Sequence, residues 1–380
     1  MTGEGPQTLV PLPAAAVPAE ARQGVGRVTI STHGASIELP ALVADAGELA
    51  ASASFEFFTA RIANANTREA YARAVARFCA WVEAGSVPLL GLSSVHVANY
   101  LDALGEAGMS VPSVKLHLAG LRHWLDWLTR RGALPFNPAA AVRGPRHSQN
   151  EGKTPVLERA EVKALFASLE TELGDIRKSE EEAAAEAPPS SAALASRRKR
   201  EQERRSAQRL IVLRDKAMLS VMLFNIPRVS AVVRMQVRDF DDTGDGWLVL
   251  HEKRGKTRRL EAHHQVRQAL RTYLTAAGLE PGGRVPLFQS APRNTGKLSG
   301  APMHRNDVGA MVKRRCAVAG LSTSICSHSF RATGLTLHHE NGGSLQAGAE
   351  LAGHESTRTT QRYVRARGQG RRQEVELIHW

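Results

Sequence analysis

Apolar residues recur at three- and four-residue steps between residues 55 and 135. In NTREAYARAVARFCAWVEAG, the apolar residues from Tyr71 to Val82 follow this spacing, which places them on one face of a helix beginning at Asn66 or Thr67. The stretches SSVHVANYLDALGEAG and SVPSVKLHLAGLRHWLDWLTRRGAL repeat the pattern, and each ends near a glycine that would stop its helix. The pattern predicts a small domain built from helices.

The second half of the chain mixes helical stretches with one β-prone region. RLIVLRDKAMLSVMLFNIPRVSAVVRMQVRDF, from residue 208, predicts an apolar helix, a turn and a second short helix. GWLVLHEKRGKTRRLEAH has two β-prone runs around a turn that contains glycine and lysine, as expected of a hairpin. Four later stretches return to the helical pattern. The fold class predicted is mainly α with a small antiparallel β-sheet.

Composition shifts divide the chain. Residues 137–155 are rich in proline, glycine and basic residues, so they predict a linker, whereas 175–207 are poor in large apolar residues and predict a partly disordered or solvent-exposed helical insertion. The RRKREQERR run within this insertion either contacts DNA or a partner or, more simply, is solvated. The expected segments are an N-terminal extension or arm (1–52), a helical domain (53–136), a linker (137–155), a second domain (156–366) with its insertion (175–207), and a tail (367–380).

The net charge narrows the class of partner. The 380 residues carry a formal charge of +13 and a pI near 10.2, which favours a polyanion such as DNA or RNA over the alternative of a generally basic soluble protein. No apolar run is long enough to cross a membrane, no secretory signal is evident, and the three cysteines form no metal spacing. These features predict a cytoplasmic protein. The basic residues of the helical domain that either face DNA or are solvated are Arg68, Arg73, Lys115, Arg122, Arg130 and Arg131.

Several side chains suited to phosphodiester chemistry stand in the second domain. His328 and Arg331 are three residues apart in HSFR, so a helix would point both to the same side. His354 in GHES precedes a helix expected from Ser356 or Thr357, and Tyr363 in QRYV would lie about two turns inside it. The remaining candidates are Arg228 in IPRVS and the hairpin lysines Lys253 and Lys256.

The order and approximate spacing of Arg228, Lys253, HxxR, His354 and Tyr363 resemble the tyrosine recombinase (phage integrase) superfamily. The resemblance covers about residues 55 to 365, apart from the insertion. It implies that the helical domain is a core-binding domain that clamps DNA and that the second domain is a mixed α/β catalytic domain.

The resemblance also implies the catalytic roles. Tyr363 would attack the phosphate while Arg228 and Arg331 hold its non-bridging oxygens with paired hydrogen bonds. His354 would donate a further hydrogen bond to these oxygens. His328 would help remove the tyrosine proton, and Lys253 would protonate the 5′ oxygen that leaves. The product would be a 3′-phosphotyrosyl bond and a free 5′ hydroxyl. Because that bond keeps the phosphodiester energy, no ATP, metal ion or other cofactor is expected.

Three departures from the family pattern stand out. An acidic residue usually follows the first arginine by three positions, but this chain has Ala231, so whatever that carboxylate orients must be held otherwise. Pro227 stiffens the approach to Arg228. LEA at 260–262 replaces the usual VPL, which makes the register of Lys253 less secure and leaves Lys256 as the alternative general acid.

The expected biological role is DNA integration or transposition by a mobile element, because the extension and the insertion exceed the minimal two-domain form. The alternatives are Xer-like resolution of chromosome dimers, type IB topoisomerase-like relaxation, and a non-catalytic DNA-binding regulator. The implied partners are double-stranded DNA with specific core sites, three further copies of the chain in a synaptic homo-tetramer, and an accessory DNA-bending or directionality protein. The enzyme would be associated with the nucleoid, and its tail would pack on a neighbouring protomer.

Overall fold

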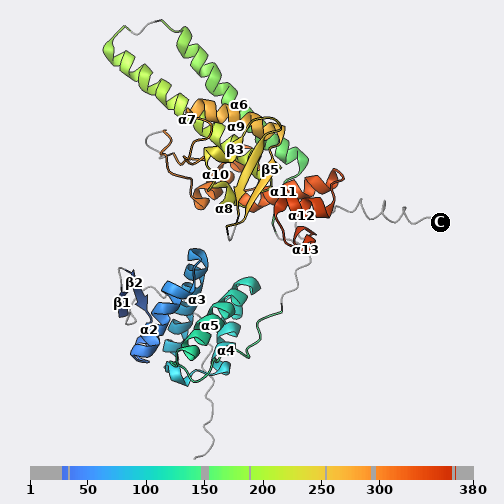
Figure 1. The fold of residues 1–380 in the computed structure, drawn as a ribbon. Helices are drawn as coiled ribbons and strands as arrows, with labels where there is room; N and C mark the ends of the chain where they lie inside the picture. The colour runs from blue at the N-terminus through green and yellow to red at the C-terminus, as the bar shows by residue number, and fades with distance from the viewer. Residues whose placement is uncertain are drawn as a thin grey trace, which may run out of the picture. The chain divides into compact units, whose positions relative to one another are not determined.

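The computed structural model describes residues 28–32, 35–146, 154–187, 190–252, 255–291, 297–361 and 364. The chain divides into two compact units, residues Met1–Ser148 and Gln149–Trp380 (Figure 1). Each unit is described by itself below. No helix in these ranges is long and apolar enough to cross a membrane.

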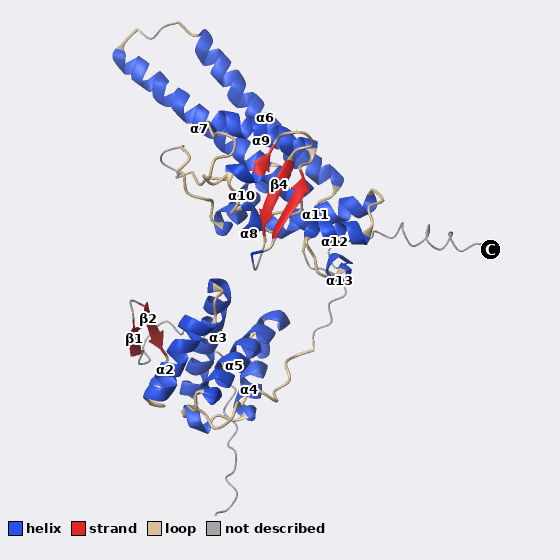
Figure 2. Ribbon diagram, in the orientation of Figure 1, coloured by secondary structure: helices blue, strands red, loops and turns tan. Residues whose placement is uncertain are grey.

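The first unit is helical, with one two-stranded antiparallel sheet near its beginning (Figure 2). Its elements are β1 (Val28–Thr32), β2 (Ala35–Leu39), α1 (Ala41–Ala44), α2 (Glu48–Glu56), a π-helical turn (Phe57–Arg61), α3 (Ala65–Ala84), a 3-10 turn (Leu89–Gly91), α4 (Ser94–Glu106) and α5 (Val111–Arg130). The helix predicted from Asn66 or Thr67 is capped earlier, because the side chain of Asn64 accepts a hydrogen bond from the backbone of Thr67.

The core of the first unit begins earlier in the chain than predicted. α2 packs against α5, where the indole of the fully buried Trp124 donates a hydrogen bond to Ser54 (3.1 Å). The backbone of Leu42, in α1, donates to the carboxylate of Glu83 (2.7 Å). The prediction that residues 1–52 form an extension or arm is therefore wrong for residues 39–52, which belong to the core of the first unit. Residues 1–27 lie outside the described residues.

The first part of the predicted linker belongs to the same unit. Ala139 and Val142 are buried, and the guanidinium of Arg122 donates hydrogen bonds to both of their carbonyl oxygens. The amide of Asn137 donates to the carbonyl of Arg122 in return (3.1 Å). These contacts fix residues 137–142 on α5, and residues 147–153 of the linker lie outside the described ranges.

The second unit combines helices with a three-stranded antiparallel sheet in the order β3–β4–β5. Its elements are α6 (Arg159–Ala185), α7 (Ala192–Phe224), α8 (Val229–Val232), a 3-10 turn (Val237–Asp239), β3 (Phe240–Asp241), β4 (Trp247–His251), β5 (Thr257–Glu261), α9 (His264–Ala277), α10 (Arg305–Val318), α11 (Ser327–Glu340), α12 (Leu345–Ala352) and α13 (Thr357–Gln361). The register pairs Trp247 with Glu261 and His251 with Thr257, which confirms the predicted hairpin.

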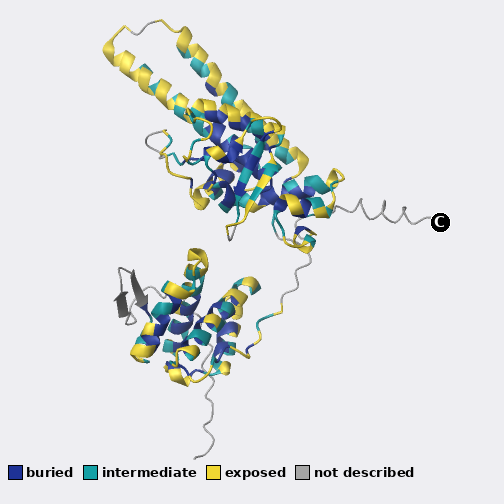
Figure 3. Cartoon of the chain, in the orientation of Figure 1, coloured by how far each residue is buried: buried dark blue, intermediate teal, exposed yellow. Residues whose placement is uncertain are grey.

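The C-terminal half of α7 lies at the centre of this unit. Every residue from Val212 to Leu223 except Lys216 is buried, and α9 and α11 pack against it. The N-terminal half of α7 and the C-terminal half of α6 extend outwards as a helical arm, whose surface is mostly exposed (Figure 3). The insertion predicted at 175–207 is this arm, and its described residues are almost entirely helical.

Candidate active site

The bend between α7 and α8 carries Arg228. Ile226 has a positive φ of 43°, which is uncommon for a β-branched residue and is a form of backbone strain often found at functional sites. Pro227 follows, and Arg228 is the N-cap of α8. The buried side chain of Ile226 packs against Leu335 and Ala352, so the strained bend is held by α11 and α12. This packing directs Arg228 towards the end of α12, where it donates to the carbonyl of Gly353 (3.4 Å).

A glycine lets α11 approach the bend closely. A Cβ built on Gly334 would lie 2.3 Å from both the carbonyl oxygen of Leu223 and the side chain of Ile226. Arg331 lies one turn earlier on the same face of α11 and is only 2% exposed. Its guanidinium donates hydrogen bonds to the carbonyl oxygens of Ile226 and Ala352. Arg331 therefore joins the bend before α8 to the end of α12.

His354 lies directly after α12, beside Arg331. Gly353 ends the helix in the left-handed conformation, with φ 60° and ψ 46°. The Nε2 atom of His354 lies 2.7 Å from a guanidinium nitrogen of Arg331, and its Nδ1 atom lies 2.9 Å from the hydroxyl of Thr360, a buried residue of α13. Arg331 can only donate, so Nε2 accepts and the single ring proton is on Nδ1, facing Thr360.

The protonation of His354 follows from its surroundings. Burial lowers its pKa to about 4, assisted by the positive charges of Arg331, Arg228 and Arg258. The ring is therefore neutral at pH 7 and accepts from Arg331 instead of donating to a phosphate. An approaching phosphate would raise this pKa, because negative charge stabilises the protonated ring, and Nε2 could then donate.

The structure also shows a carboxylate partner of Arg228 that the sequence did not predict. The carboxylate of Glu252, at the end of β4, accepts from Arg228 (2.7 Å) through one oxygen and from Arg258 (3.2 Å) through the other. Arg258 in turn donates to the carbonyl oxygens of Glu350 and Leu351 in α12. In sequence, only the position of Glu252 beside Lys253 marked it.

The other candidates occupy different positions. His328 lies on α11, and burial lowers its pKa, with further lowering by the charges of Arg331 and Arg228. Lys256 lies in the exposed hairpin turn and pairs with Glu355, the residue after His354 (3.1 Å). Lys253 and Tyr363 lie outside the described residues. The structure thus brings together Arg228, Arg331 and His354. His328 is close enough for the charges of both arginines to lower its pKa.

The cluster reaches the surface through Arg228, whereas Arg331 lies buried behind it. The side chain of Arg228 is 33% exposed, whereas Glu252 behind it is 9% exposed. A groove with a volume of about 1820 Å³ lies between the base of the arm, α9 and α10, and none of the candidate catalytic residues lines it. An open cationic cluster suits a backbone phosphate of a long polymer better than an enclosed small molecule.

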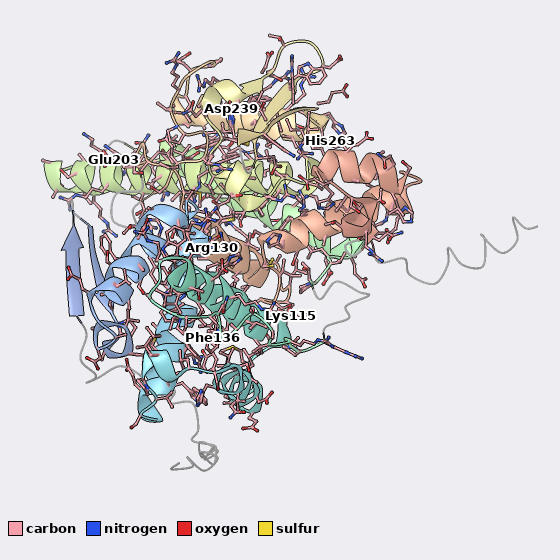
Figure 4. The ribbon with its side chains drawn as sticks, turned by 60° about the horizontal axis from the view of Figure 1, so that its bottom comes forward. Lys115, Arg130, Phe136, Glu203, Asp239 and His263 are labelled. Atoms are coloured by element: carbon pink, nitrogen blue, oxygen red, sulfur yellow. The ribbon has the colours of Figure 1, made fainter. Side chains whose placement is uncertain are left out.

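The basic residues of the first unit differ in what they contact. Arg68 and Arg122 donate to backbone carbonyls and so stabilise the fold. Three other arginines that the sequence proposed for DNA contact form ion pairs on the surface: Arg73 with Glu69, Arg130 with Asp126 and Arg131 with Glu56. Lys115 is exposed on α5 and has no ion pair among the described residues (Figure 4). Exposed ion pairs can exchange for phosphate at low cost, so these four residues remain candidates for DNA contact.

Two family models and several known proteins are similar to this chain. The model of the phage integrase family matches residues 199–369, and that of the phage integrase N-terminal SAM-like domain matches 57–132. Tyrosine recombinase XerC of Yersinia pestis is 27% identical over 275 residues, which are 72% of this chain and 75% of the relative. Tyrosine recombinase XerD of Pseudomonas aeruginosa is 27% identical over 304 residues, covering 79% of this chain and 86% of the relative.

Solved structures show the same fold. The XerH site-specific recombinase bound to palindromic difH substrate in a post-cleavage complex superposes with a TM-score of 0.58 at 17% identity, covering 82% of this chain and 79% of that one. A lambda integrase dimer bound to a COC′ core site gives a TM-score of 0.55 at 17% identity, covering 84% and 78%. The expected fold class is confirmed. Together with the two family models, these likenesses show that the chain belongs to the tyrosine recombinase (phage integrase) superfamily.

Proposed function

We propose that this protein is a site-specific recombinase that cleaves and rejoins DNA through Tyr363. The observation that supports this most strongly is that Arg228, Arg331 and His354, from three different elements, meet at the end of α12. Tyr363 follows the end of α13 by two residues, and α13 contacts His354 through Thr360. Two guanidiniums beside the segment that leads to a tyrosine suit phosphoryl transfer, in which the phosphate gains negative charge as the nucleophile attacks.

The chemistry assigns one task to each side chain. The phenolic oxygen of Tyr363 forms a bond to phosphorus and loses its proton to His328, whose lowered pKa leaves it neutral and able to accept. Arg228 and Arg331 hold the non-bridging oxygens. The bond from phosphorus to the 5′ oxygen breaks, and Lys253 or Lys256 protonates that oxygen. A 5′ hydroxyl from another strand then reverses the step.

The biological setting that we propose is integration of a mobile element. Residues 175–198 of the helical arm and the residues before 57 lie outside what the two family models match, and such additions suit contacts with further DNA or protein. The second candidate is Xer-like resolution of chromosome dimers, which the names of the relatives favour. In either setting the partners would be DNA core sites and other copies of the chain, and the tetramer of lambda integrase on a Holliday junction is the model for that assembly. The enzyme would act at the nucleoid.

A paired-site assay tests this proposal. Candidate sites come from the DNA that flanks the gene, and plasmids carry two identical sites, two dissimilar sites, or one site. Recombinant product from dissimilar sites supports integration, whereas product restricted to identical sites supports dimer resolution. Relaxation of supercoils on the one-site plasmid without recombinants would support a topoisomerase. DNA binding with neither product nor covalent adduct would support a regulator.

The recombinant product and the covalent adduct should both persist in EDTA, because the tyrosyl mechanism assigns no step to a metal ion. A strict requirement for magnesium would contradict the proposed mechanism. The matched control is the Tyr363→Phe protein, which keeps the aromatic ring and lacks only the hydroxyl.

A further inference from the structure

The position that usually carries an acidic residue after the first arginine is Ala231 in this chain, and it is fully buried in α8. Arg228 nevertheless has a carboxylate partner, supplied from the hairpin 24 residues further along the chain. We propose that Glu252 is a positioning residue that orients the guanidinium of Arg228 for the phosphate, in place of the acidic side chain missing at Ala231. This inference rests on the proposed function.

Both oxygens of Glu252 are used. One accepts from Arg228 at 2.7 Å and the other from Arg258 at 3.2 Å, and the carboxylate is only 9% exposed. Hydrogen bonds between two charged groups are roughly twice as strong as neutral ones, and burial reduces their screening. Glu252 is therefore a fixed anion between two fixed cations.

Arg258 connects this anion to the rest of the site. Its side chain is 16% exposed, and its guanidinium donates to the carbonyl oxygens of Glu350 and Leu351 at the end of α12. His354 lies two residues after the end of α12. Glu252 thus ties Arg228 to the same helix terminus that holds Arg331 and His354, so the two guanidiniums keep a defined separation.

The orientation of Arg228 matters because a guanidinium is planar. One terminal nitrogen of Arg228 donates a hydrogen bond to Glu252, and the other donates one to the carbonyl of Gly353. In the part of the chain that the structure describes, no group accepts from the three remaining N–H groups of this guanidinium. Two anchored N–H groups fix the plane, and the others are left for phosphate oxygens. Such preorganisation lowers the barrier because the donors need no rearrangement as charge develops.

Glu252 also closes the hairpin. Its backbone N–H donates to the carbonyl oxygen of Lys256 (2.7 Å), across the turn that contains both candidate general acids. One residue therefore positions Arg228 and sets the base of the turn that carries the lysines. The alternative role for Glu252 is that of a shield, an anion that competes with phosphate for Arg228 and so slows cleavage. The test distinguishes this role from positioning.

The test is single-turnover cleavage of a nicked suicide duplex at saturating DNA, with DNA affinity and thermal midpoint measured in parallel. Glu252→Gln keeps the shape and removes the charge. We expect a roughly 10-fold slower cleavage rate, as for one lost charged hydrogen bond, at a temperature well below the thermal midpoint. The midpoint itself should fall, because the change leaves the charges of Arg228 and Arg258 facing a neutral amide, and DNA binding should be equal or tighter. Glu261→Gln is the control, because Glu261 is exposed on β5 of the same hairpin and has no ion pair among the described residues.

A double-mutant cycle assigns the effect to Arg228. In the Arg228→Lys background, whose ammonium has no plane to orient, Glu252→Gln should slow cleavage by less than about 2-fold. An equal loss in both backgrounds overturns the inference, as does faster cleavage by the single variant, which would identify Glu252 as a shield. Wild-type rates in Glu252→Gln also overturn it while leaving the proposed function intact. Absence of adduct in the wild type would instead reject the proposed function.

Discussion

Replacing Thr360 by valine tests whether the contact between α13 and His354 is used in cleavage. Thr360 is 1% exposed, and its hydroxyl is the acceptor for the Nδ1 proton of His354 at 2.9 Å. Valine has nearly the same shape, so the change removes this acceptor without opening a cavity. The valine side chain cannot accept the Nδ1 proton of His354. The tautomer with its proton on Nδ1, in which Nε2 accepts from Arg331, is therefore destabilised.

The size of the effect follows from the cost of an unsatisfied polar group. Leaving a buried donor unpaired costs about 1–3 kcal/mol, and the lower half of that range applies because the ring is only half-buried. If the cost of about 1–2 kcal/mol falls on the transition state, cleavage slows by about 5- to 30-fold. DNA affinity should change by less than about 2-fold, because Thr360 is buried and adds no charge.

The assay is single-turnover formation of the covalent adduct with saturating DNA. Thr360→Ser is the matched control, since it keeps the hydroxyl and loses only a methyl group, and it should retain a rate within about 3-fold of the wild type. The reasoning is refuted if the valine variant cleaves at the wild-type rate. It is equally refuted if the serine and valine variants lose the same amount, because the hydroxyl would then be irrelevant.

Three further changes probe other parts of the account. Arg331→Lys keeps the charge but loses the planar contact and at least one buried hydrogen bond to a carbonyl, so adduct formation should slow at least about 100-fold; a near-normal rate would exclude the guanidinium clamp. Gly334→Ala should destabilise the second unit by about 2 kcal/mol through overpacking against Leu223, measured by urea unfolding, and an unchanged midpoint would contradict the close approach. Burial lowers the pKa of His117 to about 4, so the unfolded state binds more protons between pH 6.5 and 4. Stability of the first unit should be full above pH 6.5 and fall by roughly 1 kcal/mol on acidification, after allowance for solvent screening; melts of His117→Asn should show a shallower dependence.

The sequence predicted most of the elements because glycines mark the ends of its helices and the turn of its hairpin. Helices ended near Gly85, Gly108 and Gly132 as expected, and the hairpin formed around Gly255, whose φ is +73°. Residues 39–52 were misjudged because α2 is rich in alanine and serine, which give little hydrophobic contrast. Its burial against Trp124 is a tertiary contact that no local pattern records.

The candidate site was predicted only in part. Spacing in HSFR and GHES identified Arg331 and His354, whose positions depend on local helix geometry. Glu252 and Thr360 were missed because each acts by reaching a residue on another element. The separation of 24 residues between Arg228 and Glu252 becomes 2.7 Å only once the sheet packs against α8. Apart from the start of the first unit and the linker, the domain boundaries stay predictions, as do the roles of Lys253 and Tyr363.

Mapping the covalent adduct tests the central claim most directly. The protein is incubated with a nicked duplex carrying its site, the trapped complex is digested with protease, and the nucleotide-bearing peptide is sequenced by mass spectrometry. The account predicts attachment to the oxygen of Tyr363 through a 3′ phosphate, with no adduct from Tyr363→Phe. Attachment at any other side chain, or an adduct that survives in the phenylalanine variant, would contradict it.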